Sequence, residues 1–397
     1  MVFPTPMQGE RASDKRIDLT QELRARLASF AFPETRLFTP GPHGLSPAVT
    51  EVLQGYRALY THRAGEYKTC YARTIDLLRE LFNVPTSFTP LVFGHTGSYN
   101  WEMVAKNTPD NFRTLGIDIG SFSKRWAQVF IDLGRHADVI QANWGDGITP
   151  DRMKEKMADD YDLVLLIQNE TSTGVTLDIA SLSEAIRSVN PKAYIAVDAV
   201  SISGAVEVDI DRIRPDYYLW SLQKDFSIPA IGSVMIVSDR AAELAGSVPN
   251  RGYVLDMVEW LSRANSSQTP MTVADLTLQC ITARLEEMKA EGTDRFVRHK
   301  AIVDRHRAWA DGRGLSFLAK PGFESPTVSA ISLPEGITGP ALTAKAKELL
   351  NAQIAPGYGS TADGYIRIAA MGMTTVEETD RLLEGLGILI DNWHELE

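Results

Sequence analysis

Short apolar runs alternate with segments of helical periodicity through the middle of this 397-residue chain. Apolar runs bounded by polar or glycine-rich turns predict buried strands, and the amphipathic helices between them predict a mostly parallel sheet. The predicted strands span residues 90–93, 114–119, 162–168, 193–198, 217–220 and 233–237. The pattern therefore predicts an α/β fold.

The pattern changes towards both ends of the chain. A long helical stretch over 276–312 leads to strand-like segments at 327–333 and 365–369, which predicts a smaller α+β domain. Near the start, leucines at helical spacing predict a short amphipathic helix that packs on its own domain or on a partner subunit; they are Leu19, Leu23 and Leu27. We predict an N-terminal extension over 1–38, a large domain over 39–275 and a small domain over 276–397.

Composition and charge narrow the class of protein by exclusion. The formal net charge of −11 disfavours nucleic-acid binding, because a phosphate backbone is bound by a basic face. The apolar runs are far shorter than the roughly 20 residues of a membrane helix, and the start lacks the pattern of a signal peptide. Cys70 and Cys280 have no metal-ligand spacing, so we expect no disulfide framework, no bound metal and a reducing, cytoplasmic setting.

Small polar residues follow the predicted strands, in the segments 94–98, 120–122, 168–174, 198–201 and 221–224. In parallel sheets, ligands bind beyond the carboxyl ends of the strands. Lys224 lies there, between a strand and a loop with proline and glycine, and Asp198 ends the preceding strand. A lysine that forms a Schiff base and an acid that keeps a pyridine nitrogen protonated are what pyridoxal phosphate requires. The two residues together indicate this cofactor.

Two further features suit such a cofactor. The segment 94–98 opens a helix whose free N–H groups and dipole can hold a phosphate, although the same residue types are also common as simple helix caps. Phe122 offers an aromatic face for ring stacking, and a phenylalanine after a strand is about as often part of the core. Neither GxGxxG nor GxxxxGK[ST] occurs, which disfavours nicotinamide and P-loop sites.

The ordered series of motifs resembles the class V aminotransferases of fold type I. The motifs that carry the resemblance are Thr39-Pro40-Gly41-Pro42, the 94–98 loop, Asn169-Glu170-Thr171-Ser172-Thr173-Gly174, Asp198, Gln223-Lys224, Thr269-Pro270-Met271-Thr272 and Arg367. His62-Arg63 and Tyr365-Ile366-Arg367-Ile368 are similar to both the alanine/serine–glyoxylate and the phosphoserine aminotransferases. Ser121-Phe122-Ser123-Lys124, followed by Trp126, is closer to one branch of the phosphoserine enzymes.

The resemblance implies a set of cofactor-binding residues: Thr96, Gly97, Ser98, Phe122, Thr171, Asp198, Gln223, Lys224, Thr269 and Thr272. The phosphate would be bound by the 96–98 segment and Gln223, and Thr269 and Thr272 would reach it from the partner subunit. A homodimer with shared active sites would follow. Phe122 would stack on the ring, and Thr171 would bond the ring hydroxyl.

The resemblance also implies substrate contacts. Arg367 would bind the α-carboxylate, for which a bidentate guanidinium is suited. His62 and Arg63 would lie near the substrate side chain, and His43 is a further candidate, although a loop histidine is more often solvated. Lys224 would also move the proton between the α-carbon and the cofactor, so its pKa would have to fall through burial and nearby positive charge.

The chain departs from the family in two places. Leu222 stands where many relatives have a small residue, and the segment 357–363 lacks the His-Arg pair that some phosphoserine enzymes add to bind phosphate. We expect an aminotransferase that moves an amino group from a small L-amino acid (phosphoserine, serine, alanine or glutamate) to a small 2-oxo acid in two half-reactions. The alternatives are a lyase, desulfurase or decarboxylase with the same cofactor, or a relative that only binds a ligand.

Overall fold

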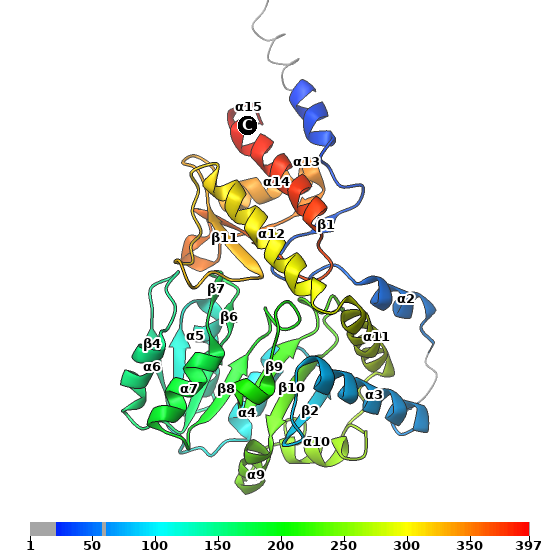
Figure 1. Cartoon of the computed structure of the whole chain (residues 1–397), viewed down its shortest axis with the longest axis vertical. Helices are drawn as coiled ribbons and strands as arrows, with labels where there is room; N and C mark the ends of the chain where they lie inside the picture. The colour runs from blue at the N-terminus through cyan, green and yellow to red at the C-terminus, as the bar shows by residue number, and fades with distance from the viewer. Residues whose placement is uncertain (1–20, 58–60, 397) are drawn as a thin grey trace, which may run out of the picture.

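A computed structural model describes residues 21–57 and 61–396 of the chain. The described residues form a large domain around a seven-stranded sheet and, above it in Figure 1, a small domain around a three-stranded sheet. None of the helices in this part of the chain combines the length and the apolarity that crossing a bilayer requires.

The large sheet has the strand order β2-β10-β9-β8-β5-β3-β4. Its strands are β2 (Phe88–Phe93), β3 (Thr114–Asp118), β4 (Ala137–Gln141), β5 (Leu163–Ile167), β8 (Tyr194–Asp198), β9 (Tyr217–Ser221) and β10 (Ser233–Ser238). Strand β10 runs antiparallel to both of its neighbours, and the other pairs are parallel. The predicted α/β fold with a mostly parallel sheet is confirmed.

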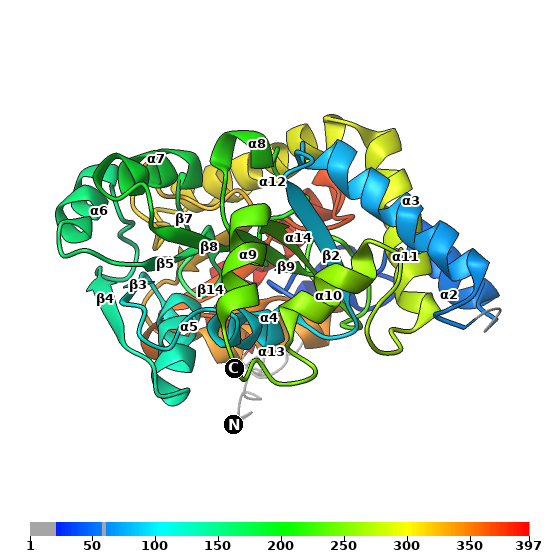
Figure 2. The same ribbon diagram turned by 90° about the horizontal axis from the view of Figure 1, so that it is seen from below.

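Helices cover both faces of this sheet, which is why its strands read as continuous apolar runs. In β5, Val164 and Leu166 belong to one apolar cluster, and Leu163, Leu165 and Ile167 belong to the cluster on the other face. Figure 2 shows the helices on the two sides. They are α2 (Pro47–Gly55), α3 (Gly65–Leu81), α4 (Gly97–Lys106), α5 (Ser121–Asp132), α6 (Pro150–Met157), α7 (Ile179–Val189), α8 (Ile210–Ile213), α9 (Asp239–Ser247), α10 (Met257–Ala264) and α11 (Asp275–Glu291).

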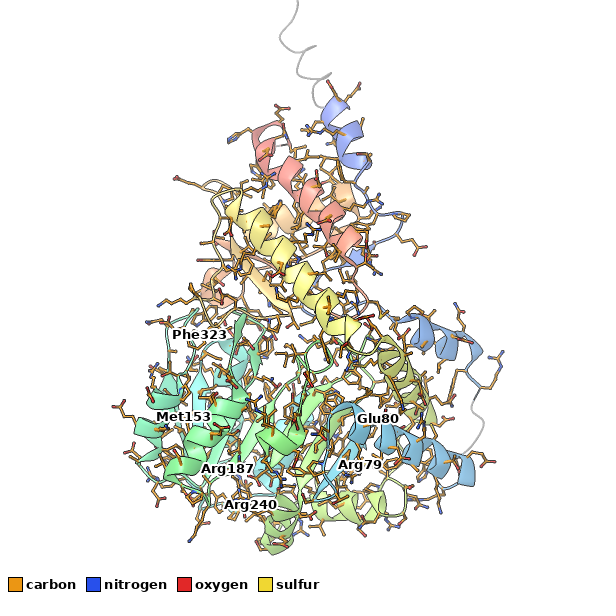
Figure 3. The ribbon with its side chains drawn as sticks, viewed as in Figure 1. Arg79, Glu80, Met153, Arg187, Arg240 and Phe323 are labelled. Atoms are coloured by element: carbon orange, nitrogen blue, oxygen red, sulfur yellow. The ribbon has the colours of Figure 1, made fainter. Side chains whose placement is uncertain are left out.

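The amino ends of all strands of the sheet except the antiparallel β10 lie at the end of the large domain remote from the small domain. Arg187 and Arg240 lie there (Figure 3). Arg240 pairs with the buried Asp216, at 2.7 Å, and Asp216 accepts the backbone N–H of Ile195 at the start of β8. This polar network joins the amino ends of β8 and β9, and the carboxyl ends of these two parallel strands face the small domain.

The small domain is built from α12 (Asp294–Asp311), β11 (Val328–Ser332), α13 (Gly339–Leu350), β12 (Ala352–Gln353), β13 (Ala355–Pro356), η1 (Gly359–Thr361), β14 (Tyr365–Ala369), α14 (Val376–Asp391) and α15 (Trp393–Leu396). Its antiparallel sheet has the order β11-β14-β13. The helical stretch predicted over 276–312 is divided at Gly292, whose φ of +61° ends α11. Residues of α11 lie in the core of the large domain, among them Leu278 and Ile281.

The N-terminal segment joins the small domain. Residues 21–28 are helical, and Leu23 and Leu27 are buried in the same apolar cluster as α13 and α14; Leu19 lies outside the described residues. Strand β1 (Arg36–Leu37) pairs in parallel with β12. Figure 1 shows this blue segment beside the orange and red helices. The chain therefore reaches the large domain from the small one, through residues 38–43.

Candidate active site

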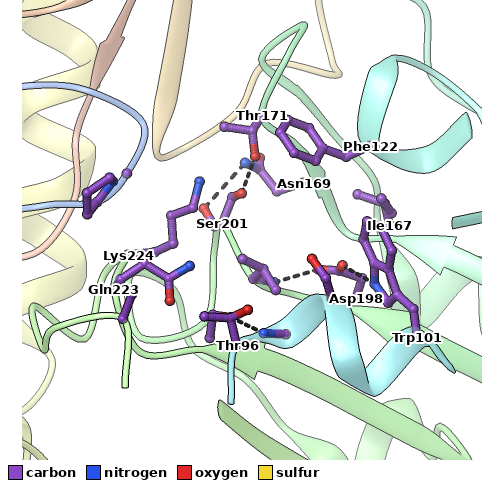
Figure 4. Close-up of a pocket in the computed structure, with 17 residues that line it drawn as sticks. Thr96, Trp101, Phe122, Ile167, Asn169, Thr171, Asp198, Ser201, Gln223 and Lys224 are labelled. Atoms are coloured by element: carbon purple, nitrogen blue, oxygen red, sulfur yellow. Dashed lines mark hydrogen bonds between the residues drawn. The ribbon is translucent and has the colours of Figure 1, made fainter. Parts of the chain in front are cut away.

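A cavity of about 320 Å³ lies at the carboxyl ends of the large sheet's strands. It is lined by eight of the residues predicted to bind the cofactor: Thr96, Gly97, Ser98, Phe122, Thr171, Asp198, Gln223 and Lys224. In Figure 4, Lys224 enters this pocket from one side, and Asp198 lies on the other. The structure thus brings together residues that are more than a hundred positions apart in the chain.

Lys224 follows strand β9 and is enclosed by the loop that precedes α2. Its Nζ donates a hydrogen bond to the carbonyl oxygen of Pro40. Burial, together with the positive charge of Arg367, lowers the pKa of Lys224 to about 8, against the opposing effect of Asp198. A larger share of this amine is therefore neutral, and nucleophilic, near neutral pH than for an ordinary lysine.

Gly41 allows the loop to lie on Lys224. Its φ is +111°, in the region that favours glycine, and a Cβ at this position would overlap the Lys224 side chain. The backbone N–H of His43 also donates to the carbonyl oxygen of Gln223, at 2.9 Å. The turn that begins at Thr39 therefore forms one wall of the pocket.

Asp198 ends strand β8 and is only 4% exposed. One carboxylate oxygen accepts Nε1–H of Trp101 at 2.7 Å, and the other accepts the backbone N–H of Val200 at 2.8 Å. Burial raises the pKa of Asp198 to about 6, and these two hydrogen bonds counteract the rise. No sequence motif indicated a role for Trp101; its one signal is that it is a large aromatic residue one turn into the helix that follows the 94–98 loop.

The N-terminus of α4 points into the same pocket. Thr96 is the N-cap, and its side chain makes no capping hydrogen bond. A Cβ at Gly97 would lie 2.8 Å from Ser221 Oγ and 2.9 Å from Val200 Cγ2, so only glycine fits this close approach. Gln223 also lines the pocket, and its side-chain amide offers N–H donors to an anion. These uncommitted polar groups at a helix N-terminus fit a phosphate.

Glu170 fixes the position of Phe122. It is fully buried, and its Oε2 accepts the N–H groups of Phe122 and Ser123 at 3.1 and 2.8 Å, in the first turn of α5. Its Oε1 accepts the N–H and the hydroxyl of Ser172 at 3.0 and 2.6 Å. A carboxylate at a helix N-terminus is favourable, so Glu170 holds α5 against the loop that follows β5. The sequence motif contained Glu170, but nothing in the motif indicated this contact.

Arg367 lies on β14 of the small domain and is 8% exposed. Its Nη1 donates to the carbonyl oxygen of Thr171 at 3.0 Å, and its Nε donates to that of Pro356 at 3.0 Å. Burial lowers its pKa. The Thr171 hydroxyl in turn contacts that of Ser201. Arg367 does not itself line the cavity, but it is held beside Thr171, which does, where the small domain contacts the large one.

Asp225, the neighbour of Lys224, connects the large domain to the small domain. It is fully buried, and its Oδ1 lies 2.7 Å from His299 Nε2 on α12 and accepts the N–H of Gly372 at 2.8 Å. His299 holds the pKa of Asp225 below its usual range, against the effect of burial. Gly372 follows the strand that carries Arg367, so Asp225 relates the position of Lys224 to that of Arg367.

His43 is not brought into the pocket. Its Nε2 lies 2.8 Å from Thr374 Oγ1, and its ring packs where a Cβ on Gly372 would be. Burial lowers its pKa to about 4, so the ring is neutral at ordinary pH. The turn that places its backbone beside Gln223 directs its side chain into the small domain.

Four other predicted residues form a separate cluster away from the pocket of their own chain. Arg63 donates to the carbonyl oxygens of Thr269 and Pro270, at 2.9 and 3.2 Å. Thr272 Oγ1 lies 3.3 Å from His62 Nδ1. His62, Arg63, Thr269 and Thr272 thus lie together, but none of them lines the cavity.

The arrangement offers covalent attachment and proton transfer. Lys224, whose pKa is lowered, and the buried carboxylate of Asp198 line one cavity with the N-terminus of α4, and the charge of Arg367 acts on Lys224. Among the described residues, no group of three or more His, Cys, Asp or Glu side chains could hold a metal ion. The residues present therefore fit an aromatic, phosphorylated carbonyl compound such as pyridoxal phosphate.

Comparisons with known proteins agree with this geometry. The family model described as Aminotransferase class-V matches residues 39–277. The serine–glyoxylate aminotransferase of Hyphomicrobium methylovorum is 28% identical over 85% of each chain, and the L-aspartate–glyoxylate aminotransferase of Paracoccus denitrificans is 26% identical over 85% of this chain and 87% of its own. The crystal structure of a phosphoserine aminotransferase from Cytophaga hutchinsonii superposes with a TM-score of 0.80 at 25% identity, covering 89% of this chain and 98% of that one.

Proposed function

The chain belongs to the class V aminotransferase family and is an aminotransferase, and we propose that it uses pyridoxal phosphate on Lys224 to move an amino group from a small L-amino acid to a small 2-oxo acid. The observation that carries this proposal is the pairing, in one cavity, of a lysine whose pKa falls to about 8 with the buried Asp198. The fold is that of type I pyridoxal phosphate enzymes.

The residues that would hold the cofactor follow from the pocket. Thr96, Gly97, Ser98 and Gln223 would bind its phosphate, and Phe122 would stack on its ring. Asp198, held by Trp101, would bind the ring nitrogen and keep it protonated. When bound, the cofactor supplies an electron sink for the charge that remains when the α-proton leaves.

Lys224 and Arg367 would act on the substrate. Arg367 would bind the α-carboxylate with the part of its guanidinium not used by Thr171 and Pro356. Lys224, released when the substrate amine takes its place, would accept the α-proton and deliver it to the cofactor carbon. A pKa near 8 suits a group that must both take and give a proton near neutral pH.

We further propose a homodimer in which each subunit completes the site of the other. The support is the cluster of His62, Arg63, Thr269 and Thr272, which lies outside its own pocket although the family resemblance assigns these residues to the active site. We propose a cytoplasmic location because Cys70 and Cys280 are free thiols.

Titration of the holoenzyme with donors tests the function. L-Serine, L-alanine, L-aspartate, L-glutamate and L-phosphoserine are added one at a time while the visible spectrum is recorded. A donor of the enzyme replaces the band of the lysine-bound cofactor with that of the pyridoxamine form, and glyoxylate or 2-oxoglutarate restores the first band. Bleaching without recovery, with release of a 2-oxo acid and ammonia, would instead assign a lyase.

A further inference from the structure

Arg125 lies beside Phe122, which lines the pocket, and has no acidic partner among the described residues. It is exposed on the first turns of α5, and its guanidinium carbon lies 5.2 Å from the centre of the Phe122 ring. Its Nη2 donates to the Tyr358 hydroxyl at 3.2 Å. No carboxylate of the described residues forms an ion pair with it. The neighbouring Lys124, in contrast, lies 3.9 Å from Asp118.

Tyr358 connects Arg125 to the residue that would bind the α-carboxylate. The ring centre of Tyr358 lies 5.6 Å from that of Phe122 and 5.1 Å from the guanidinium carbon of Arg367. Arg125 and Phe122 thus contact each other and Tyr358, and Tyr358 contacts Arg367; we call these four residues the rim row. The row crosses from α5 of the large domain to β14 of the small domain.

Local contacts hold Tyr358 in this row. Its backbone N–H donates to Thr361 Oγ1 at 3.1 Å, and the same hydroxyl donates to the Tyr358 carbonyl oxygen at 2.9 Å. Gly359, with a φ of +53°, turns the chain where a Cβ would lie only 3.3 Å from the Trp144 ring. Tyr358 is thus positioned by the backbone, in the segment that lacks a His-Arg pair.

The charges around the pocket leave Arg125 available to a ligand. Asp198 is bonded to Trp101 and Val200, and Glu170 is satisfied by the first turn of α5 and by Ser172. Phe122 lines the cavity and contacts both the Arg125 guanidinium and the Tyr358 ring. A substrate held by Arg367 would place its α-carboxylate at one end of the rim row, with a cation at the other end.

We propose that Arg125, held by Phe122 and Tyr358, binds a second acidic group at the end of the donor's side chain. The preferred donor is then an acidic L-amino acid whose side chain ends in a carboxylate or a phosphate. The inference rests on the proposed function and narrows its substrate class. Its physical basis is that a guanidinium whose orientation is fixed loses little freedom when it binds such a group.

Two variants and one control test this subsite. Arg125→Gln removes the cation, Tyr358→Phe removes only the hydroxyl that accepts its hydrogen bond, and Lys124→Gln removes the adjacent exposed charge as a matched control. Steady-state kinetics are measured with L-aspartate, L-glutamate and L-phosphoserine, and with L-serine and L-alanine. The three acidic donors distinguish a carboxylate from a phosphate.

In Arg125→Gln, kcat/KM for the preferred acidic donor is expected to fall about 10-fold or more, mainly through KM, and to change less than about 2-fold for neutral donors. Tyr358→Phe has a smaller effect of the same selectivity, and Lys124→Gln has none. Without turnover, maleate should inhibit the wild type more strongly than propionate does, and Arg125→Gln should lose this difference. Unchanged activity with the neutral donors shows that the variants are folded.

Two results overturn the inference. The first is a kcat/KM that changes equally for acidic and neutral donors in Arg125→Gln, or that changes for neither. The second is a wild type that uses only neutral donors, in which case the proposed function stands and the acidic subsite does not. If no donor converts the bound cofactor to its pyridoxamine form, the proposed function itself fails, which is a separate outcome.

Discussion

Capture of pyridoxal phosphate by the apo-protein should follow the ionisation of Lys224, because only the neutral amine attacks a carbonyl carbon. With a pKa of about 8, roughly 10% of the Lys224 amine is neutral at about pH 7. At the ordinary value of 10.5, only about 0.03% would be neutral. The pocket therefore accelerates capture by roughly 300-fold at this pH if nothing else differs.

The substitution Arg367→Gln tests the cause of this shift. Its loss removes a positive charge that lowers the pKa of Lys224, so that pKa should rise towards its ordinary value. Capture should slow near neutral pH and should approach the wild-type rate at about pH 10, where both amines are largely neutral. The control is Arg305→Gln, which removes a surface guanidinium paired with Asp380 on the small domain.

The assay is stopped-flow absorbance of the lysine-bound cofactor after apo-protein is mixed with pyridoxal phosphate at pH values from about 6 to about 10. We expect a midpoint near pH 8 for the wild type and Arg305→Gln, and a higher midpoint for Arg367→Gln. A wild-type midpoint near 10.5 would refute the argument from burial. Coinciding profiles of wild type and Arg367→Gln would refute the argument from charge.

Three further predictions concern the residues around Lys224. Gly41→Ala should weaken cofactor binding in equilibrium titrations, because its Cβ would overlap Lys224. The control is Gly336→Ala, where φ is +89° and the space is open: it should lower the free energy of unfolding by the backbone strain of about 1–2 kcal/mol and leave cofactor binding unchanged. Asp225→Ala should lower the free energy of unfolding by about 3–5 kcal/mol in urea titrations, since it leaves His299 buried without its partner; a loss below about 1 kcal/mol would contradict the buried pair. Burial raises the pKa of Asp198 to about 6, so the unfolded state binds fewer protons between about pH 4 and pH 6, and this residue should make apo-protein stability fall as pH rises through that window. Thermal unfolding of the apo-protein should show that contribution disappear in Asp198→Asn.

The sequence predicted the strands of the large sheet well because they are buried on both faces. Each of the six predicted strands is present, with ends that differ by one or two residues. Strand β4 was not predicted, because it lies at the edge of the sheet, where Ile140 is its one buried residue and the apolar run is short. The break at Gly292 was missed because helical periodicity continues on both sides of it.

The sequence was sufficient to predict that residues at strand ends lie close together, but not to predict side-chain contacts between different elements. Asp198 ends β8 and Lys224 follows the neighbouring β9, so the sheet topology alone places them at one edge. Trp101 contacts Asp198 from a helix, and Tyr358 contacts Phe122 from the other domain. No fixed spacing along the sequence indicates either contact. His43 was predicted from its place after the turn, whereas its side chain direction depends on Thr374.

The proposed function depends on Lys224 as the residue that holds the cofactor. The most direct measurement is to reduce the holoenzyme with borohydride, digest it and locate the pyridoxyl group by peptide mass spectrometry. We predict that the group is found on Lys224, and that Lys224→Ala carries none and shows no transamination. A pyridoxyl group on a different lysine, or a Lys224→Ala variant that remains active, would contradict the account.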